Sequence, residues 1–165
     1  MSLPEFSTQS SLFSTAALSG TLFDATDRYR LFGQLIFPRL VAVRPQLERC
    51  YCADNGRVAV EPVLMLGTSV LQFLDGVTDR RAVEMLRYHV GWNFALNRQV
   101  GDELFHPSSL SDFRQRLLDH KLSAIGFEAI LDGLVDAGLV PQHSRQRLGY
   151  RRVLGKPRVH RDAPD

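Results

Sequence analysis

The sequence is poor in the residues that build metal centres and disulfide scaffolds. Its 165 residues include two cysteines, Cys50 and Cys52, and five histidines that are scattered along the chain. A structural zinc site needs about four ligands, usually arranged as two closely spaced pairs, and the sequence offers a single C-x-C pair. We therefore expect no metal or other cofactor, and we interpret the two cysteines as reduced thiols.

Long apolar runs are also missing. No segment approaches the ~20 apolar residues that span a bilayer. Residues 1–18 lack the basic start and the sustained apolar stretch of a signal peptide. These absences predict a soluble, cytoplasmic protein. Hydrophobic residues nevertheless make up 44% of the chain, which is enough for one domain with its own core.

Charge is distributed unevenly along the chain. The formal net charge is +2, yet residues 145–165 carry seven basic residues against two acidic ones, so the rest of the chain is acidic. A basic arm on an acidic body is typical of tails that contact nucleic acid, and it also describes a solvated chain end. The candidate DNA contacts in this arm are Arg145, Arg147, Arg151 and Arg152.

Helical periodicity runs through most of the chain, and strand-like alternation appears nowhere. A first helix is expected from Thr26, which would cap it, with Pro38 or Pro45 as its interruption. Pro45 also suits the first turn of a second helix over residues 47–51. Residues 54–56, Asp-Asn-Gly, are a turn signal.

The strongest helix is expected to open at Glu61-Pro62 and to end at Asp75-Gly76. Its apolar positions are Val63, Leu64, Met65, Leu66, Val70, Leu71, Phe73 and Leu74. They cover so much of the circumference that this helix should lie at the centre of the core. Thr78 is expected to cap the next helix, which Gly91 ends, and residues 92–96 then form a short turn. The inward positions of that helix are Ala82, Val83, Leu86 and Val90.

Two further helices complete the pattern. Ser109 and Asp112 form a capping box that starts a helix with one apolar side; the residues of that side are Leu110, Phe113 and Leu117. The last helix is expected over residues 122–137, before Gly138 and Pro141; its inward residues are Phe127, Ile130, Leu131 and Leu134. The sequence thus predicts an all-α fold, a small helical bundle containing a helix-turn-helix-like unit. We divide the chain into a loose lead-in over residues 1–24, a helical domain over 25–140 and a basic, irregular tail over 141–165.

Four blocks in sequence order carry a resemblance to a known family. They are PVLML (62–66), LQFLDGVTDR (71–80), WNFAL (92–96) and HPSSLSDFRQRL (106–117). Over about residues 25–148 the chain resembles the N-terminal domain of insertion-sequence transposases of the DDE class. In that family P-x-x-M-L, Q-x-x-x-G and S/T-D-R precede an H-S-T-L-S-x-F-R-x-R-L block. The resemblance implies binding of double-stranded DNA at the terminal inverted repeats of a mobile element.

The chain departs from the family pattern directly after this region. In the family, the next segment leads into an RNase-H-like domain whose first catalytic aspartate lies in D-S-T. Here Leu148 is followed by Gly149-Tyr150-Arg151-Arg152, with no carboxylate at that position. DNA cleavage of this kind needs carboxylates that hold two divalent ions. We therefore expect a truncated transposase domain that is not itself an enzyme.

The helix from Ser109 to Asp119 is our candidate for the helix that enters the major groove. Its candidate residues are Ser109, Ser111, Gln115 and Arg116. Glutamine and arginine side chains can read base edges when a helix enters the major groove. Asp112 and Asp119 share that face and oppose phosphates, so an ordinary amphipathic bundle helix is the alternative. Arg114 falls toward the apolar flank and is expected to snorkel or to pair with a carboxylate.

The helix after Thr78 is a candidate for contacts with the DNA backbone. Arg80, Arg81 and Arg87 on this helix are candidates for phosphate contacts, which fix register without reading sequence. The alternative is a solvated face with a local arginine–glutamate pair. We interpret Trp92 and Phe94 as core residues rather than as side chains that stack on bases.

Several functions remain open at this point. The first is recognition of terminal repeats, and the second is a protein–protein pairing module that self-associates or pairs with full-length transposase and inhibits it. The acidic body favours the second function. A generic helix-turn-helix regulator is the third, and it would require an operator-like palindrome rather than repeats that flank an element.

Overall fold

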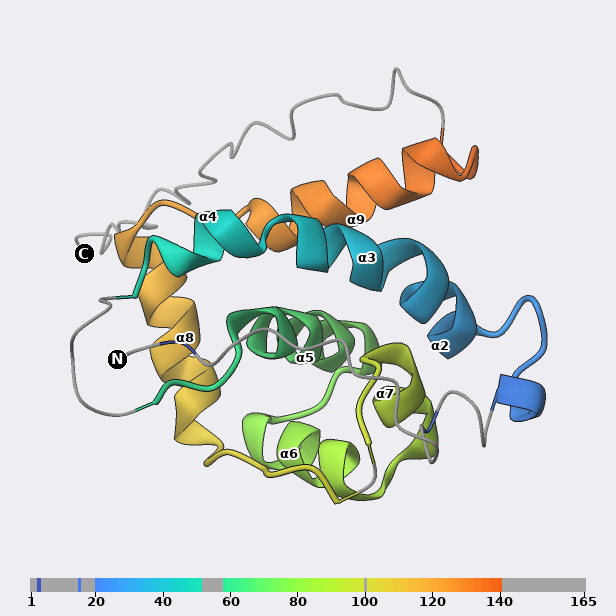
Figure 1. The fold of residues 1–165 in the computed structure, drawn as a ribbon, viewed down its shortest axis with the longest axis horizontal. Helices are drawn as coiled ribbons and strands as arrows, with labels where there is room; N and C mark the ends of the chain where they lie inside the picture. The colour runs from blue at the N-terminus through green and yellow to red at the C-terminus, as the bar shows by residue number, and fades with distance from the viewer. Residues whose placement is uncertain (1–2, 4–14, 16–19, 52–57, 100, 141–165) are drawn as a thin grey trace, which may run out of the picture.

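The computed structural model describes residues 3, 15, 20–51, 58–99 and 101–140. The elements are η1 (Gly20–Leu22), α2 (Arg28–Leu31), η2 (Phe32–Ile36), α3 (Phe37–Ala42), α4 (Arg44–Glu48), α5 (Pro62–Asp75), α6 (Asp79–Tyr88), α7 (Val90–Ala95), α8 (Ser108–Asp119) and α9 (Ile125–Asp136). Figure 1 shows α5 between the row formed by α2, α3 and α4 and helix α6, with α7 and α8 on either side. The fold is all-α, as predicted, and the described part of the chain contains no strand.

Helix α5 is central, as its wide apolar surface predicts. Glu61 caps it by accepting the N–H of Val63 at 3.4 Å, and Pro62 stands in the first turn, where no N–H is needed. Gly76 ends the helix in the left-handed region, with φ 63°. α5 contacts α3, α4, α6, α8 and α9. Its buried apolar side chains include Val63, Met65, Leu66 and Leu71.

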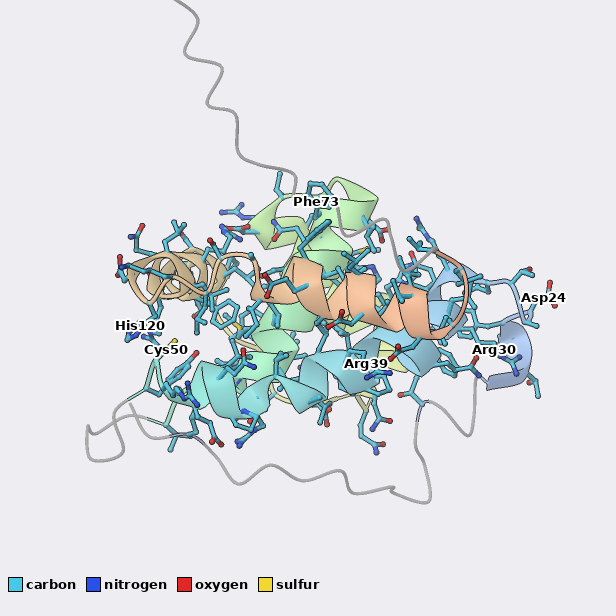
Figure 2. The ribbon with its side chains drawn as sticks, turned by 90° about the horizontal axis from the view of Figure 1, so that it is seen from above. Asp24, Arg30, Arg39, Cys50, Phe73 and His120 are labelled. Carbon is cyan, nitrogen blue, oxygen red and sulfur yellow. The ribbon has the colours of Figure 1, made fainter. Side chains whose placement is uncertain are left out.

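The last turn of α5 corrects the predicted apolar stripe. Phe73 is 86% exposed and Leu74 is exposed as well, and Figure 2 shows Phe73 at the edge of the molecule. The reason is the place at which α9 crosses: a Cβ on Gly126 of α9 would meet Leu66 and Val70 of α5. Helix α9 therefore covers the middle of this face of α5 and leaves its end in solvent.

Helix α9 also differs from its prediction, both in where it begins and in which residues it buries. It begins at Ile125 rather than at residue 122, and Phe127, predicted to point inward, is exposed. The close approach of the two helices favours the small Gly126 at the contact. The buried residues of α9 are Ile125, Gly126, Ala129 and Gly133, and Ile130 and Leu134 pack against this core. Gly138 follows the helix with φ 70°, as a helix-stop glycine should.

The N-terminal helical path continues past Pro38, the first of the two predicted interruptions, and breaks before Pro45, the second. Asp27, not Thr26, caps α2, because its Oδ1 accepts the N–H groups of Tyr29 (2.8 Å) and Arg30 (3.3 Å). Pro38 does not interrupt the path, since it stands in the first turn of α3 directly after the π-helical turn η2. A π turn widens the helix and accommodates such a local disturbance. Pro45 lies in the first turn of α4, as predicted, but this helix spans Arg44–Glu48 rather than residues 47–51.

Helix α6 ends earlier than Gly91. Thr78 caps it by accepting the N–H of Arg81 at 3.3 Å, as predicted. His89 leaves the helix with extended backbone, and its Nδ1 accepts the N–H of Trp92 at 3.2 Å, which starts α7. Val90, predicted to be buried, is exposed at the start of α7, and residues 92–96 belong mostly to this helix rather than to a turn. Gly91 lies inside α7, where the ring of Tyr29 leaves no room for a side chain.

Helix α8 begins at Ser108, and its start contradicts the predicted capping box. Ser109 and Asp112 form no side-chain cap; instead Nδ1 of His106 accepts the N–H of Ser108 at 3.2 Å. The upstream imidazole thus takes the place of the serine. The inward residues Leu110, Phe113 and Leu117 are buried, as predicted.

Some predicted segments lie outside the described residues. These are most of the lead-in over 1–24, Cys52, the turn at 54–56 and the tail over 141–165. None of the helices in the described ranges has the length and apolar character that a membrane crossing requires.

The packing of Gly91 can be tested by substitution. A Cβ there would lie 2.5 Å from Cδ2 and 2.8 Å from Cε2 of Tyr29, so we expect Gly91→Ala to lower the free energy of unfolding by about 1–3 kcal/mol. Urea denaturation measures this. Gly33→Ala is the matched control, because its Cβ would meet Ala95 at an ordinary 3.5 Å; helix propensity should leave that variant neutral or more stable by about 0.5–1 kcal/mol. Equal losses in both variants would contradict the expectation.

Candidate nucleic-acid interface

Helices α5 and α6 are joined by a short turn whose residues each have a defined role. Gly76 takes the left-handed conformation, and the N–H of Val77 returns to the carbonyl of Gln72 at 3.2 Å. Thr78 then caps α6. The turn therefore ends one helix and starts the next within residues 76–78, without a flexible loop.

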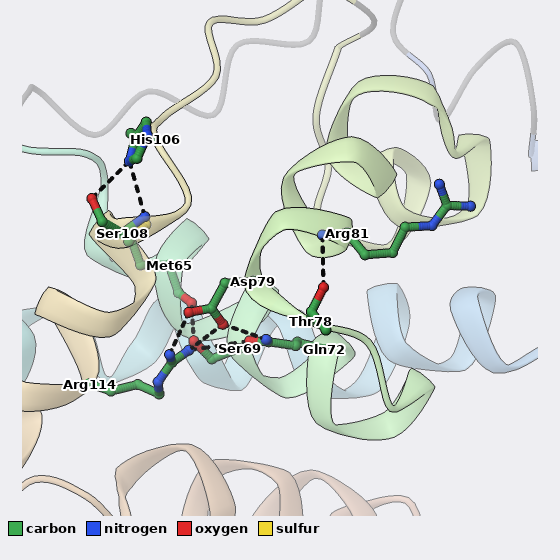
Figure 3. A network of polar contacts seen from close by, with 9 residues as sticks. All are labelled: Met65, Ser69, Gln72, Thr78, Asp79, Arg81, His106, Ser108 and Arg114. Carbon is green, nitrogen blue, oxygen red and sulfur yellow. Dashed lines mark hydrogen bonds and ion pairs between the residues drawn. The ribbon is translucent and has the colours of Figure 1, made fainter.

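A polar network fixes the start of α6 to two other helices. Arg114 of α8 donates to both carboxylate oxygens of Asp79, at 2.7 and 3.1 Å, and Gln72 of α5 donates to Oδ1 at 2.6 Å. Arg114 also donates to the side-chain oxygen of Gln72 at 3.3 Å. Figure 3 shows the three side chains converging between the helices. Of the two roles predicted for Arg114, snorkelling and pairing with a carboxylate, the structure shows the pairing.

This network changes the acidity of Asp79. Hydrogen bonds from Arg114 lower the pKa of the carboxyl below its usual value, and Gln72 and the charge of Arg114 add to this against the opposing effect of burial. Asp79 is thus held as an anion and is turned inward, although it is the first residue of α6. Its charge is neutralised within the fold.

The outward face of α6 carries the three arginines predicted for this helix. Arg80, Arg81 and Arg87 are all exposed. Arg81 pairs with Glu84 at 2.8 Å, and the guanidinium of Arg87 lies 5.8 Å from the ring centroid of Tyr88. Arg80 has neither a hydrogen bond nor an ion pair to the residues that the structure describes. In Figure 3 the side chain of Arg81 extends away from the Asp79 network.

The candidates on α8 make contacts within the protein. Gln115 donates to Asp119 at 2.9 Å, and the half-buried Arg116 stacks over the ring of Tyr51 at 4.3 Å. Ser109 is half-buried and Ser111 is exposed. The candidates of the basic tail, Arg145, Arg147, Arg151 and Arg152, lie outside the described residues.

A buried carboxylate at the end of α5 is a feature that sequence reasoning missed. The side chain of Asp75 is 7% exposed and ion-pairs with Arg28 at 3.0 Å. It also accepts hydrogen bonds from Trp92 Nε1 (2.8 Å) and from the hydroxyl of Tyr29 (3.1 Å). The sequence offered only an aspartate before a glycine, which reads as a helix stop, because its partners come from distant helices.

The aromatic and histidine side chains around Asp75 are also perturbed. Burial raises the pKa of Tyr29, and the charge of Asp75 acts in the same direction. Burial lowers the pKa of His89, and the charges of Arg28 and Arg81 lower it further, against an opposing effect of Asp75. A neutral His89 suits its structural role, since only an unprotonated Nδ1 accepts the N–H of Trp92. Among the residues described, no group of three or more histidine, cysteine or acidic side chains is placed to hold a metal.

The fold and this surface define an all-α domain that presents arginines on the second helix of a closely connected pair. Residues 20–116 match the family model described as Transposase domain (DUF772). Because this match covers more than half of the chain, the chain belongs to that transposase domain family, and its role is related to transposition. Comparison with curated proteins and with solved structures gives no match.

The contribution of the Asp79 network to stability should depend on pH. Asp79 and Arg114 are 29% and 42% exposed, so solvent weakens the pair and we expect Asp79→Asn to cost about 1 kcal/mol at neutral pH. The folded-state pKa of Asp79 is lowered, so its contribution is fully present above the unfolded value of about 4 and is lost as pH falls through the folded value. The difference in unfolding free energy between the wild type and Asp79→Asn should therefore become smaller below pH ~4.

Urea denaturation over a pH series measures this difference. Asp112→Asn is the control, because Asp112 is an exposed carboxylate on α8 and its removal should change the unfolding free energy little. A gap between wild type and Asp79→Asn that stays constant down to the lowest accessible pH would contradict the role assigned to the carboxylate.

Proposed function

We propose that this domain binds double-stranded DNA and that α6 is the helix that faces it. The observation that carries the proposal is the outward face of α6, where Arg80, Arg81 and Arg87 are exposed while Asp79 turns inward to Arg114. The turn between α5 and α6 supports it, because helix-turn-helix proteins use such short, glycine-containing turns and place the second helix in the major groove.

Helix α8 supports α6 and is a weaker candidate for the groove. The exposed charged residues of α8 are Asp112 and Asp119, so its outward face is net negative, whereas α6 exposes three arginines and one glutamate; a net negative face is repelled by the phosphates that flank a groove. Gln115 is already bonded to Asp119, and Arg116 is stacked on Tyr51. We propose that the α8 candidates act as secondary contacts beside α6; they are Ser109, Ser111, Gln115 and Arg116.

The DNA that a transposase-family domain must find is the end of its element, and we propose the terminal inverted repeats as the target. Residues 25–140 supply the recognition surface in this proposal. The basic residues of 141–165 add affinity that is independent of sequence and sensitive to salt, because they would release counterions from the phosphates.

The proposed interface can be tested by neutralising α6. We expect the double variant Arg80→Gln, Arg87→Gln to bind a labelled terminal-repeat duplex at least about ten-fold more weakly, and the slope of log K against log salt to fall by about 2, one unit for each lost phosphate contact. Fluorescence anisotropy over a salt series, with a scrambled duplex in parallel, measures both quantities.

Two sets of variants act as controls for this experiment. Arg49→Gln and Lys121→Gln remove exposed cations outside α6 and should leave affinity for the repeat unchanged. Glutamine at the four tail arginines, Arg145, Arg147, Arg151 and Arg152, should weaken the repeat and the scrambled duplex equally. Wild-type affinity in the α6 double variant would rule out α6 as the interface.

A second candidate function is pairing of protein chains. The observation that favours it is the exposed apolar surface on α5 and α9, which contact each other and carry Phe73 and Phe127 in solvent. Exposed large apolar side chains that lie on neighbouring elements are typical of protein interfaces. We propose that this surface mediates self-association or pairing with full-length transposase, beside DNA binding rather than in place of it.

Pairing can be separated from DNA binding by a single substitution. We expect Phe73→Ser to shift the chain from dimer to monomer in sedimentation velocity runs over a concentration series, with little loss of stability because the ring is already exposed. DNA affinity per chain should change far less than in the α6 variant. Leu118→Ser removes an exposed leucine on α8 and should leave the dimer intact. A wild-type chain that is monomeric at every concentration would exclude self-association.

A further inference from the structure

One carboxylate stands among the arginines on the outward face of α6. Glu84 is exposed, and it lies one helical turn from Arg81 on one side and from Arg87 on the other. Nη1 of Arg81 contacts Oε2 of Glu84 at 2.8 Å. The other acidic residue of the helix, Asp79, faces inward to Arg114. The negative charge in the middle of this cationic face therefore belongs to Glu84.

The position of Glu84 distinguishes two ways in which α6 could meet DNA. Against a phosphate backbone, the carboxylate would be repelled. In the major groove the same carboxylate meets base edges, where it accepts a hydrogen bond from the N4 amino group of cytosine. The face of α6 is thus suited to insertion in the groove, with its outer arginines directed to the flanking phosphates.

The tips of Arg81 and Glu84 lie 2.8 Å apart, which is on the scale of the separation between adjacent base pairs. Three residues advance a helix by about 4.5 Å, and consecutive base pairs are about 3.4 Å apart. Because the two side chains start about one helical turn apart and converge at their tips, they can reach neighbouring base pairs. Arginine reads the O6 and N7 acceptors of guanine.

We propose that Arg81 and Glu84 together recognise one guanine and one cytosine in neighbouring base pairs, and we call this pair the reader; the proposal rests on the proposed function. Arg81 donates to the guanine, and Glu84 accepts from the cytosine. Their mutual contact keeps the two tips next to each other on the outward face of α6. Arg80 and Arg87, on either side of this pair, contact phosphates and set the register.

Selection from a randomised duplex library tests the reader. Wild type, Glu84→Gln and Glu84→Ala are each used to select sites. The matched control is Glu128→Gln, which neutralises an exposed carboxylate on α9. An amide matches the N6 and N7 groups of adenine. The sites selected by Glu84→Gln should therefore carry adenine at the position where the sites selected by wild type carry cytosine. Wild type should prefer the cytosine duplex over the adenine duplex by about ten-fold, and Glu84→Gln should invert that order.

The other variants complete the test. Glu84→Ala should lose the preference at that position and keep the rest of the site, and Glu128→Gln should select the wild-type site. Thermal melting followed by circular dichroism checks that each variant folds, which we expect because an exposed ion pair adds little stability. An unchanged site in Glu84→Gln would overturn the reader and leave DNA binding intact. A wild-type chain that retains no duplex would overturn both the reader and the proposed function.

Discussion

The ion pair between Asp79 and Arg114 joins three helices at the point where α6 begins. Gln72 brings in α5, Arg114 brings in α8, and Asp79 is the first residue of α6 itself. The same contact also determines the charge of the surface. A carboxylate at the start of α6 would otherwise offset the neighbouring arginines, and by turning inward it leaves the outer face of the helix mostly cationic in a body that is acidic as a whole.

A second buried carboxylate organises the other side of the domain. Asp75 lies at the end of α5 and binds Arg28 and Tyr29 of α2 together with Trp92 of α7. Because α2 begins the described helical path, this cluster joins its start to the centre of the fold. The turn that connects α5 and α6 is therefore flanked by polar anchors on both sides, and the apolar core surrounds α5 between them.

Local signals in the sequence were sufficient where the partner of a residue lies within the same turn. Pro62, Gly76 and Thr78 start, end and cap helices as predicted, because their roles depend on their own backbone geometry and on N–H groups nearby. The all-α class and the central place of α5 followed from apolar periodicity alone. The place of Arg114 on the apolar flank left two roles open, snorkelling and pairing with a carboxylate, and the structure shows the second.

The features that depend on distant contacts were not predictable in this way. Gly91 looks like a helix stop until the ring of Tyr29 is known to lie against it, and Phe73 looks like core until the crossing point of α9 is known. The start of α8 depends on the imidazole of His106, which no serine pattern reveals. The DNA contacts themselves remain predictions.

Helix α6 is held at both of its ends, and this has a consequence for any ligand that it meets. Arg114 is hydrogen-bonded to Asp79, the first residue of the helix. His89, which follows the last residue, accepts the N–H of Trp92 in α7, and the indole of Trp92 donates to Asp75. A helix held in this way resists tilting and rolling when it docks. If it enters a DNA groove, the mutual adjustment falls mainly on the duplex, and the sites it favours would be those whose flanking steps bend or widen at low energetic cost, even where no side chain touches them.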